Sequence, residues 1–328
     1  MGETTITLLI IAAAVLLLAA AVLISAYFSY KKAFARKDRG EDPYRALDTP
    51  KYAPYSAALR KMISDISTEE YESVSITASD GTHLAGRYYH RQDGAPIHVI
   101  FHGYRSTPLR DGAGGGCDSR YMGHNLLLVY QRAHGESGGG AISFGIRERY
   151  DVVDWMRYLT ERFGENTEII LIGTSMGAAT VIMASELGLP KTVRCVIADC
   201  PYSSPREVIM RSAAAMGFPP GPVSPFIRLG ARLFGGFSIE ASSPIEAIKR
   251  ATLPILLVHG EADSLVPCEM SVRLAEAAKA AGVECSLEIF EGAEHCLPFM
   301  ADHKRYERIR NEFLTRYIKG MRGGEDAR

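Results

Sequence analysis

The sequence predicts an α/β protein with a mostly parallel, eight-stranded sheet, helices on both faces of the sheet and a small helical cap. Three observations support this prediction. From residue 72 onward, short apolar segments alternate with segments of helical periodicity. The apolar segments are unbroken, as is typical of strands that are buried on both faces. A long stretch in the second half, residues 203–250, has no strand pattern and is expected to form the cap.

The sheet is expected to begin with a hairpin. Residues 73–78 and 83–90 are rich in strand-forming residues, and the turn signal Asp80-Gly81 separates them. The hairpin adds antiparallel strands at one edge of an otherwise parallel sheet. The six further strands are predicted at residues 96–101, 125–130, 168–172, 195–198, 255–258 and 285–290.

Helices are expected between these strands. Residues 150–163 place apolar side chains at helical spacing, residues 178–187 are rich in alanine and methionine, and residues 298–320 form the last helical segment. The glycine-rich segment 112–116 does not follow a strand as a dinucleotide-binding motif would, and we interpret it as a flexible loop near the mouth of the site.

The cap segment combines apolar residues with prolines. Its large apolar side chains either form an apolar surface above a site at the carboxyl edge of the sheet or only pack the cap onto the sheet. The sequence leaves both options open. These residues are Met210, Met216, Phe218, Phe226, Leu229, Leu233, Phe234 and Phe237.

The amino terminus predicts a membrane anchor over residues 1–30. Residues 6–28 carry no charge, and a helix of that length spans about 34 Å, enough to cross a bilayer core of about 30 Å. A cleaved signal peptide is the first alternative, but no basic residue precedes the run and no clear cleavage site follows it. A buried core helix is the second alternative, and the polar segment that follows the run argues against it.

Basic residues directly after this run indicate its orientation. Lys31, Lys32, Arg36, Lys37 and Arg39 stand against the single acid Asp38. Positive charge favours the cytoplasmic side of a membrane, so we expect a single-pass protein whose globular domain is cytoplasmic. The expected organisation is a juxtamembrane linker and lead-in over residues 31–70, followed by the catalytic domain over residues 71–322.

Charge and cysteine content limit the other partners. The net charge of −1 shows no basic excess of the kind that nucleic-acid binding requires. None of the six cysteines forms a CxxC pair or has zinc-finger spacing with histidine, so we expect free thiols and no metal. The oligomeric state is not indicated.

The strongest chemical signal is the segment Gly173-Thr174-Ser175-Met176-Gly177. It fits G-x-S-x-G and lies between a predicted strand and a predicted helix, which is the context that the motif requires. Glycines allow the sharp turn that exposes the serine hydroxyl, so Ser175 is the predicted nucleophile.

A serine needs a base, and the base needs a carboxylate that orients it. His295 follows the last predicted strand and is the predicted base, whereas His102 fits the oxyanion loop and His134 fits a structural loop. Asp263 follows the strand at 255–258 and is the predicted carboxylate, with Glu261 as its competitor.

Two backbone N–H groups should bind the oxyanion that forms during acyl transfer. Met176 directly follows the nucleophile, and Tyr104 lies in the loop after the strand at 96–101. These two amides are the predicted oxyanion donors.

Residues 72–320 resemble the α/β-hydrolase superfamily in the segments FHGYRS, QRAHGESGG, GTSMG, HGEADSLVP and GAEH. The chain is most similar to the branch of serine aminopeptidases and prolyl-oligopeptidase-type domains, which includes membrane-anchored bacterial esterases. The resemblance implies acyl transfer through an acyl-serine without a cofactor. One position departs from the branch, because Gln131 stands where an aspartate is common.

The predicted function is therefore hydrolysis of small or lipid-like acyl esters by a serine hydrolase. A serine peptidase of the aminopeptidase type shares the same triad and is the main alternative. A non-catalytic, membrane-tethered binding protein is the other alternative, although such a protein has no need of all three triad residues. An apolar, closed pocket favours esters, and an acidic subsite favours peptides.

Overall fold

The computed structural model describes residues 2–37, 42–45 and 47–319. Its centre is an eight-stranded sheet with the order β1-β2-β4-β3-β5-β6-β7-β8. β1 pairs with β2 and β2 with β4 in the antiparallel sense, and all other pairs are parallel. The predicted α/β class, the strand number and the opening hairpin are confirmed.

The strands agree closely with the predicted segments. They are β1 (Glu72–Thr77), β2 (His83–Tyr89), β3 (Ile97–Phe101), β4 (Asn125–Val129), β5 (Ile169–Thr174), β6 (Val193–Asp199), β7 (Ile255–Gly260) and β8 (Cys285–Phe290). The inner strands β3, β4 and β7 are buried along their whole length, which explains why their sequences lack the polar alternation of a half-exposed strand.

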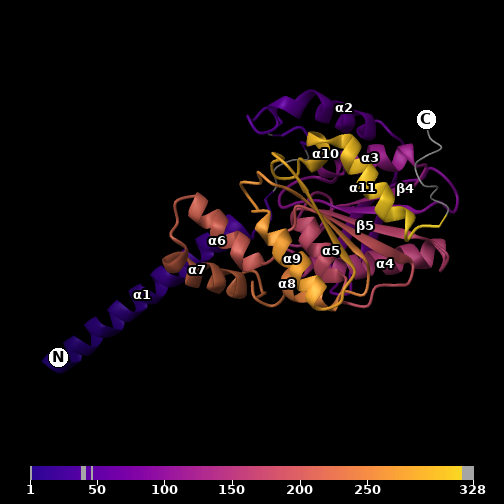
Figure 1. Ribbon diagram of the computed structural model, residues 1–328. Coiled ribbons are helices and arrows are strands. Elements are labelled where there is room, and N and C mark those ends of the chain that lie inside the picture. The colour runs from indigo at the N-terminus through magenta and orange to yellow at the C-terminus, as the bar shows by residue number, and fades with distance from the viewer. Residues whose placement is uncertain (1, 38–41, 46, 320–328) are drawn as a thin grey trace.

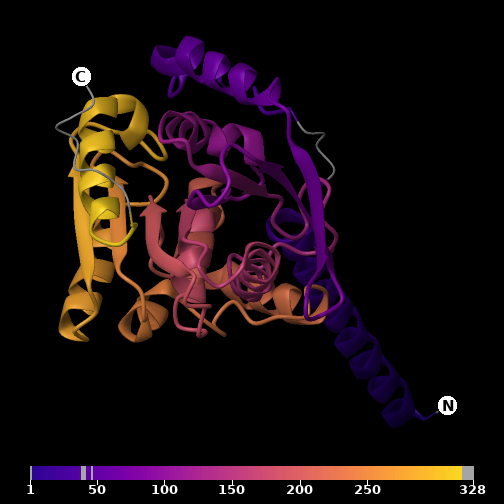
Figure 2. The same cartoon turned by 90° about the vertical axis from the view of Figure 1, so that its right-hand side faces the viewer.

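Helices cover both faces of the sheet (Figures 1 and 2). One face carries α4 (Glu148–Phe163), α5 (Met176–Ala184) and α9 (Glu269–Ala280), around a core that includes the single tryptophan, Trp155. The other face carries α2 (Ser56–Ser67), α3 (Pro108–Tyr121) and α11 (His303–Thr315).

The cap consists of α6 (Pro205–Ala215), α7 (Pro220–Leu233) and the short α8 (Pro244–Ala247). Its large apolar residues divide into three groups, of which one, Met210, Phe226 and Leu229, is half-buried. Phe237 is buried against the body, whereas Met216, Phe218, Leu233 and Phe234 are exposed. The cap therefore both packs onto the body and presents an apolar outer surface.

The prediction of a flexible loop at residues 112–116 is wrong. These glycines lie inside α3, which packs tightly against its neighbours. A Cβ atom on Gly112 would lie 2.5 Å from Leu128, one on Gly115 2.5 Å from Ile100, and one on Gly116 2.2 Å from Ile66. The glycines allow close packing of α3 between the sheet and α2.

The carboxyl-terminal helical segment is interrupted. α10 (Pro298–Ala301) ends before Asp302, whose side chain accepts a hydrogen bond from the Arg305 N–H and starts α11. The predicted segment reached residue 320, and the predicted domain end at 322 also lies outside the described residues.

Helix α1 (Glu3–Ala33) extends away from the body alongside α7 (Figure 1). It is long and apolar enough to cross a membrane, with a mean hydropathy of 3.0 and no burial in its most apolar window. A signal sequence has the same properties. Of the charged residues that follow the apolar run, Asp38 and Arg39 fall outside the described residues.

Contacts extend beyond the expected anchor boundary at residue 30. Ala35 forms an antiparallel bridge with Ala141, and Phe34 is fully buried. The first residues of the expected linker are therefore part of the folded body. The helical lead-in that follows corresponds to α2, which is preceded by a short 3-10 turn (Ala53–Tyr55).

Candidate active site

Ser175 occupies the turn between β5 and α5 in a backbone conformation that is uncommon for a side-chain-bearing residue, with φ 55° and ψ −111°. The glycines on either side make this turn possible. A Cβ atom on Gly177 would lie 1.9 Å from the carbonyl oxygen of Phe101, and one on Gly173 would lie 2.3 Å from the Gly177 backbone. Both glycines of the G-x-S-x-G segment are thus required by close backbone contacts.

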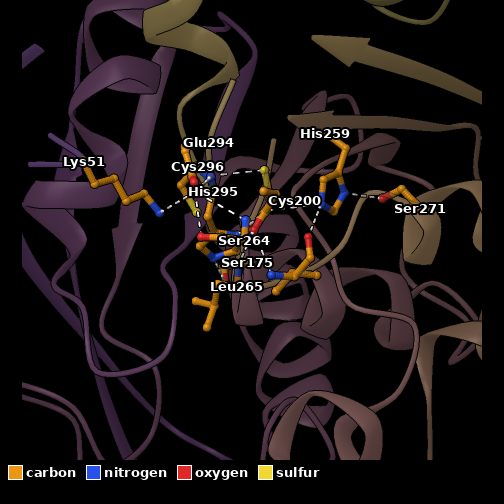
Figure 3. Close-up of polar contacts among 12 residues, drawn as sticks. Lys51, Ser175, Cys200, His259, Ser264, Leu265, Ser271, Glu294, His295 and Cys296 are labelled. Carbon is orange, nitrogen blue, oxygen red and sulfur yellow. Dashed lines mark hydrogen bonds and ion pairs between the residues drawn. The ribbon is translucent and has the colours of Figure 1, made fainter. Parts of the chain in front are cut away.

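The structure brings Ser175, His295 and Asp263 together at the carboxyl edge of the sheet, from the ends of β5, β8 and β7. The Ser175 Oγ lies 2.8 Å from His295 Nε2, and His295 Nδ1 lies 2.6 Å from Asp263 Oδ2. Figure 3 shows Ser175 beneath the loop that carries Glu294, His295 and Cys296. The histidine and the aspartate are buried, and the serine is partly exposed.

The loop after β7 carries both Asp263, the predicted partner of His295, and its competitor Glu261. Asp263 Oδ1 accepts hydrogen bonds from the N–H groups of Val266 at 2.7 Å and Leu265 at 3.0 Å, which leaves Oδ2 toward His295. Glu261 instead accepts a hydrogen bond from the Gly292 N–H at 3.1 Å. Of these two carboxylates, Asp263 is the one that contacts the His295 ring.

His259 supports this aspartate and was missed by sequence reasoning. It is fully buried at the end of β7, where its Nδ1 lies 2.6 Å from Ser271 Oγ and its Nε2 lies 2.8 Å from the Val266 carbonyl and 3.2 Å from Asp263. In the sequence, only its position four residues before Asp263 indicated that His259 could contact this aspartate.

The charges of these groups are strongly coupled. Although burial raises the pKa of Asp263, hydrogen bonds from His259 and His295 outweigh this effect and hold that pKa well below its usual range. Burial alone lowers the pKa of His295, but the adjacent Cys296 and the Asp263 carboxylate raise it above the usual range. The aspartate is therefore ionised in the folded protein, and the histidine binds a proton tightly.

The loop after β3 passes directly beside the serine. A Cβ atom on Gly103 would lie 3.4 Å from the Ser175 Cβ. The Gly103 N–H donates to Asp111 Oδ2 at 2.7 Å, so this amide is engaged and is not the oxyanion donor. The next amide along the loop is that of Tyr104, and Met176 begins α5 on the other side of Ser175.

Asp111 is the second residue that sequence reasoning missed, because it adjoins the glycine run that was interpreted as a loop. Its Oδ1 also accepts a hydrogen bond from Ser106 Oγ at 2.7 Å, so this one carboxylate holds the loop at two points.

His102 and His134 support the same loop, as expected. His102 Nδ1 lies 2.8 Å from the Gly103 carbonyl, and its Nε2 accepts a hydrogen bond from the Gln131 N–H at 3.2 Å. His134 Nε2 accepts a hydrogen bond from the Arg105 N–H at 3.0 Å. The Gln131 side chain donates to the His102 carbonyl, a hydrogen bond that an ionised aspartate at this position could not donate.

Two cysteines adjoin the site. Cys200 ends β6, and its Sγ accepts a hydrogen bond from the Cys296 N–H at 3.3 Å. A hydrogen bond from the Cys200 thiol lowers the pKa of Cys296 to about 6. Donor atoms of Cys200, His295 and Cys296 lie within 4.8 Å of one another, which would suit a thiol-binding ion, but His295 already contacts Ser175 and Asp263.

A serine, a histidine and an aspartate arranged in this way at the edge of an α/β sheet are typical of α/β hydrolases, and sequence comparison agrees. The chain belongs to the prolyl oligopeptidase family, whose model matches residues 139–321. Its structure has the α/β-hydrolase fold, as the resemblance of its motifs predicted.

Among curated proteins, the chain is similar to YqkD of Bacillus subtilis, with 29% identity over 194 residues that make up 59% of this chain and 63% of YqkD. It is also similar to YfhR of Escherichia coli K12, with 25% identity over 220 residues, 63% of this chain and 68% of YfhR. Both relatives are described as uncharacterized. The match thus spans less than two thirds of the length of YqkD.

Among solved structures, the Pyrococcus furiosus esterase Pf2001 is similar with a TM-score of 0.60 and 25% identity, over 78% of this chain and 95% of the esterase. Est1E from Butyrivibrio proteoclasticus, bound to ferulic acid, is similar with a TM-score of 0.56 and 20% identity, over 76% of this chain and 99% of Est1E. The acylaminoacyl peptidase of Pyrococcus horikoshii gives 0.55 at 18% identity, over 78% of this chain and 43% of the peptidase. The last two similarities show the fold alone.

Proposed function

We propose that the chain is a membrane-anchored carboxylic ester hydrolase that acts through an acyl-serine intermediate. Ser175 is the nucleophile, His295 the general base and acid, and Asp263 the carboxylate that orients the histidine. The observation that carries this proposal is the pair of hydrogen bonds, 2.8 Å from Ser175 to His295 and 2.6 Å from His295 to Asp263.

In the first half of the reaction, His295 Nε2 accepts the Ser175 proton as Oγ attacks the ester carbonyl carbon. Asp263 keeps the remaining ring proton on Nδ1 and stabilises the imidazolium that forms. The N–H groups of Tyr104 and Met176 donate to the oxyanion, and each such donor is typically worth about 2.7–4 kcal/mol in the transition state. His295 then protonates the leaving alcohol.

In the second half, His295 activates a water molecule that attacks the acyl-serine. The tetrahedral intermediate uses the same two amides and collapses to the carboxylic acid and free Ser175. All of these steps use the chain's own side chains and backbone, so the proposal requires no cofactor and no metal ion.

An ester substrate is favoured over a peptide for two reasons. The Pf2001 esterase is similar at 25% identity over most of both chains. Met176 also packs in one apolar cluster with the cap residues Val208 and Ile209, which suits an acyl chain better than a charged peptide terminus. The family name and the similarity to an acylaminoacyl peptidase keep a serine peptidase as the second candidate.

Membrane attachment through α1 is part of the same proposal. Residues 1–30 form a single-pass anchor, residues 31–70 a juxtamembrane segment, and residues 71–322 the catalytic domain, with the cap at about 203–250. Ala26 and Phe34 are fully buried against the body, which supports a retained helix over a cleaved signal peptide. The basic residues after the span favour a cytoplasmic catalytic domain.

The test uses the full chain in detergent micelles, beside a Ser175→Ala variant. Both are treated with a fluorophosphonate probe, with p-nitrophenyl esters of increasing chain length, and with aminoacyl and acyl-aminoacyl amides. We expect labelling and ester turnover in the wild type and neither in the variant. Labelling with amide turnover but no ester turnover would shift the function to a peptidase. A folded wild type that is not labelled would contradict the triad and favour a binding protein.

A further inference from the structure

The loop that carries Tyr104 is fastened to the end of the anchor helix. Tyr104 Oη donates a hydrogen bond to the carbonyl of Ala33 at 2.7 Å, and Arg105 Nη2 donates to the carbonyl of Lys32 at 2.8 Å. The last carbonyls of a helix have no partner within the helix, so these side chains cap α1. The guanidinium also complements the negative end of the helix dipole.

Aromatic packing reinforces this connection. The Tyr104 ring stacks on Phe144 with ring centroids 4.9 Å apart. Phe144 contacts Phe34, and Phe34 contacts Phe237 of the cap region at a centroid distance of 5.3 Å. A continuous set of rings thus links the loop, the end of α1 and the cap.

The backbone after α1 is held as firmly. The Ile142 N–H donates to the Phe34 carbonyl at 2.7 Å, and the Arg36 N–H donates to the Gly140 carbonyl at 2.9 Å. The Arg36 side chain donates to the carbonyls of Ser137 and Gly135. The segment after the helix is therefore locked into the body.

Helix α1 itself docks on the cap. Gly230 of α7 lies so close to α1 that a Cβ atom there would be 2.3 Å from the Ala26 carbonyl oxygen. Tyr27 and Tyr30 both contact the ring of Phe234, with centroid distances of 5.3 Å and 5.9 Å. Figure 1 shows α1 leaving the body alongside α7. The helix is thus attached to the body over about its last two turns.

Arg105 has a positive φ of 53°, in a region that side-chain-bearing residues seldom occupy. Such strain persists only where surrounding contacts enforce it. Here the contacts come from His134, which accepts from the Arg105 N–H, and from the carbonyl of Lys32, which accepts from its guanidinium. The end of α1 therefore helps to hold the backbone turn that sets the direction of the Tyr104 amide.

We infer that the last turn of α1 is a positioning element of the oxyanion loop, so that the anchor helix determines the activity of the site as well as its location. The side chains of Tyr104 and Arg105 are positioning groups, and the Tyr104 N–H is the group that touches the substrate. This inference rests on the proposed hydrolase function. It predicts that loosening the loop from α1 weakens transition-state binding more than substrate binding.

The experiment uses the full chain in detergent micelles and compares Tyr104→Phe with Tyr317→Phe. The first variant removes only the hydroxyl that reaches Ala33 and keeps the stacked ring. The control removes a hydroxyl that reaches Glu284 at the far end of the domain. Measurements are kcat and KM for a p-nitrophenyl ester, the inhibition constant of a trifluoromethyl ketone, and Tm.

For Tyr104→Phe we expect kcat to fall about 3- to 10-fold, the factor of one net hydrogen bond, with little change in KM. Affinity for the trifluoromethyl ketone, which mimics the tetrahedral intermediate, should fall by the same factor. Tyr317→Phe should keep wild-type values. Arg105→Lys, which keeps the charge but loses the planar guanidinium, should change kcat in the same direction.

The inference is overturned if the wild type is active and both loop variants, folded by Tm, keep wild-type kcat and ketone affinity. A wild type that neither reacts with fluorophosphonate nor turns over esters would overturn the proposed function instead. A fall in Tm alone, with unchanged kcat, would show that the contacts stabilise the fold without positioning the loop and would also overturn the inference. If Tyr104→Phe unfolds, Arg105→Lys decides between these outcomes.

Discussion

Replacing Gly177 with alanine places a methyl group where the end of β3 already passes. The added Cβ would lie 1.9 Å from the Phe101 carbonyl oxygen, 2.5 Å from its carbonyl carbon and 2.9 Å from the His102 carbonyl oxygen. All three are backbone atoms, so no side-chain rotation relieves the contact. Since real Cβ contacts stay beyond 3.0 Å, α5 and β3 must separate by about 1 Å.

That separation acts on both sides of the proposed oxyanion site. Met176 moves with α5, and the loop that carries Tyr104 moves with β3. A displacement of about 1 Å in reacting groups can lower the rate by about 100-fold. Overpacking of this kind also costs about 1–3 kcal/mol of stability. We therefore expect Gly177→Ala to lose about 100-fold in kcat/KM and to unfold at a lower temperature.

The assay combines p-nitrophenyl ester turnover, the rate constant of fluorophosphonate labelling and thermal unfolding. Gly140→Ala is the matched control, because a Cβ atom there has no neighbour within 4 Å and its φ is not in the left-handed region. The control should keep wild-type activity. Wild-type kcat/KM in Gly177→Ala would refute the reasoning that backbone contact at this glycine sets the geometry of the site.

Three further predictions concern the relay, its pH dependence and the docked helix. Asp263→Asn should lower kcat by about 10⁴-fold by stabilising the wrong tautomer of His295, which steady-state ester hydrolysis measures, and a loss below tenfold would contradict the assigned role. Because the base acts only when neutral, kcat/KM should rise with pH through the raised pKa of His295. Cys296→Ala removes a group that raises the pKa of His295, so the midpoint of that pH–rate profile should move to lower pH. An unmoved midpoint would show that Cys296 does not affect the base. Gly230→Ala should lower the free energy of unfolding by about 1–3 kcal/mol, because its Cβ would lie 2.3 Å from the Ala26 carbonyl oxygen. Denaturant unfolding of the full chain in detergent measures this change, and unchanged stability would argue against docking of α1.

The strands could be predicted because their signal is local. Segments such as residues 125–129 consist almost entirely of apolar side chains, and the structure buries each of them. The glycine run in α3 was misassigned for the opposite reason. Its low helix propensity is a local property, whereas the close approach of Ile66, Ile100 and Leu128 that requires glycine there involves three distant segments.

The three predicted relay residues lie together in space, as their positions at the ends of parallel strands suggested. The groups that support them could not be found in this way. Asp111 holds the Gly103 amide and His259 contacts Asp263, but neither belongs to a recognisable motif. A carboxylate in a helix or a histidine at the end of a strand has many ordinary roles, and only its neighbours identify the one it has.

The amino-acid sequence by itself determined the order of the strands along the chain, the candidate nucleophile and its relay partners, and the presence of a long apolar helix. These features depend on periodicity and on short motifs, which are properties of neighbouring residues. Only the tertiary structure decided that the Ala33 carbonyl meets the Tyr104 hydroxyl and that α1 packs on α7 through Gly230. Such contacts join segments that are far apart in the chain, and they depend on how the whole sheet, cap and helix pack against one another.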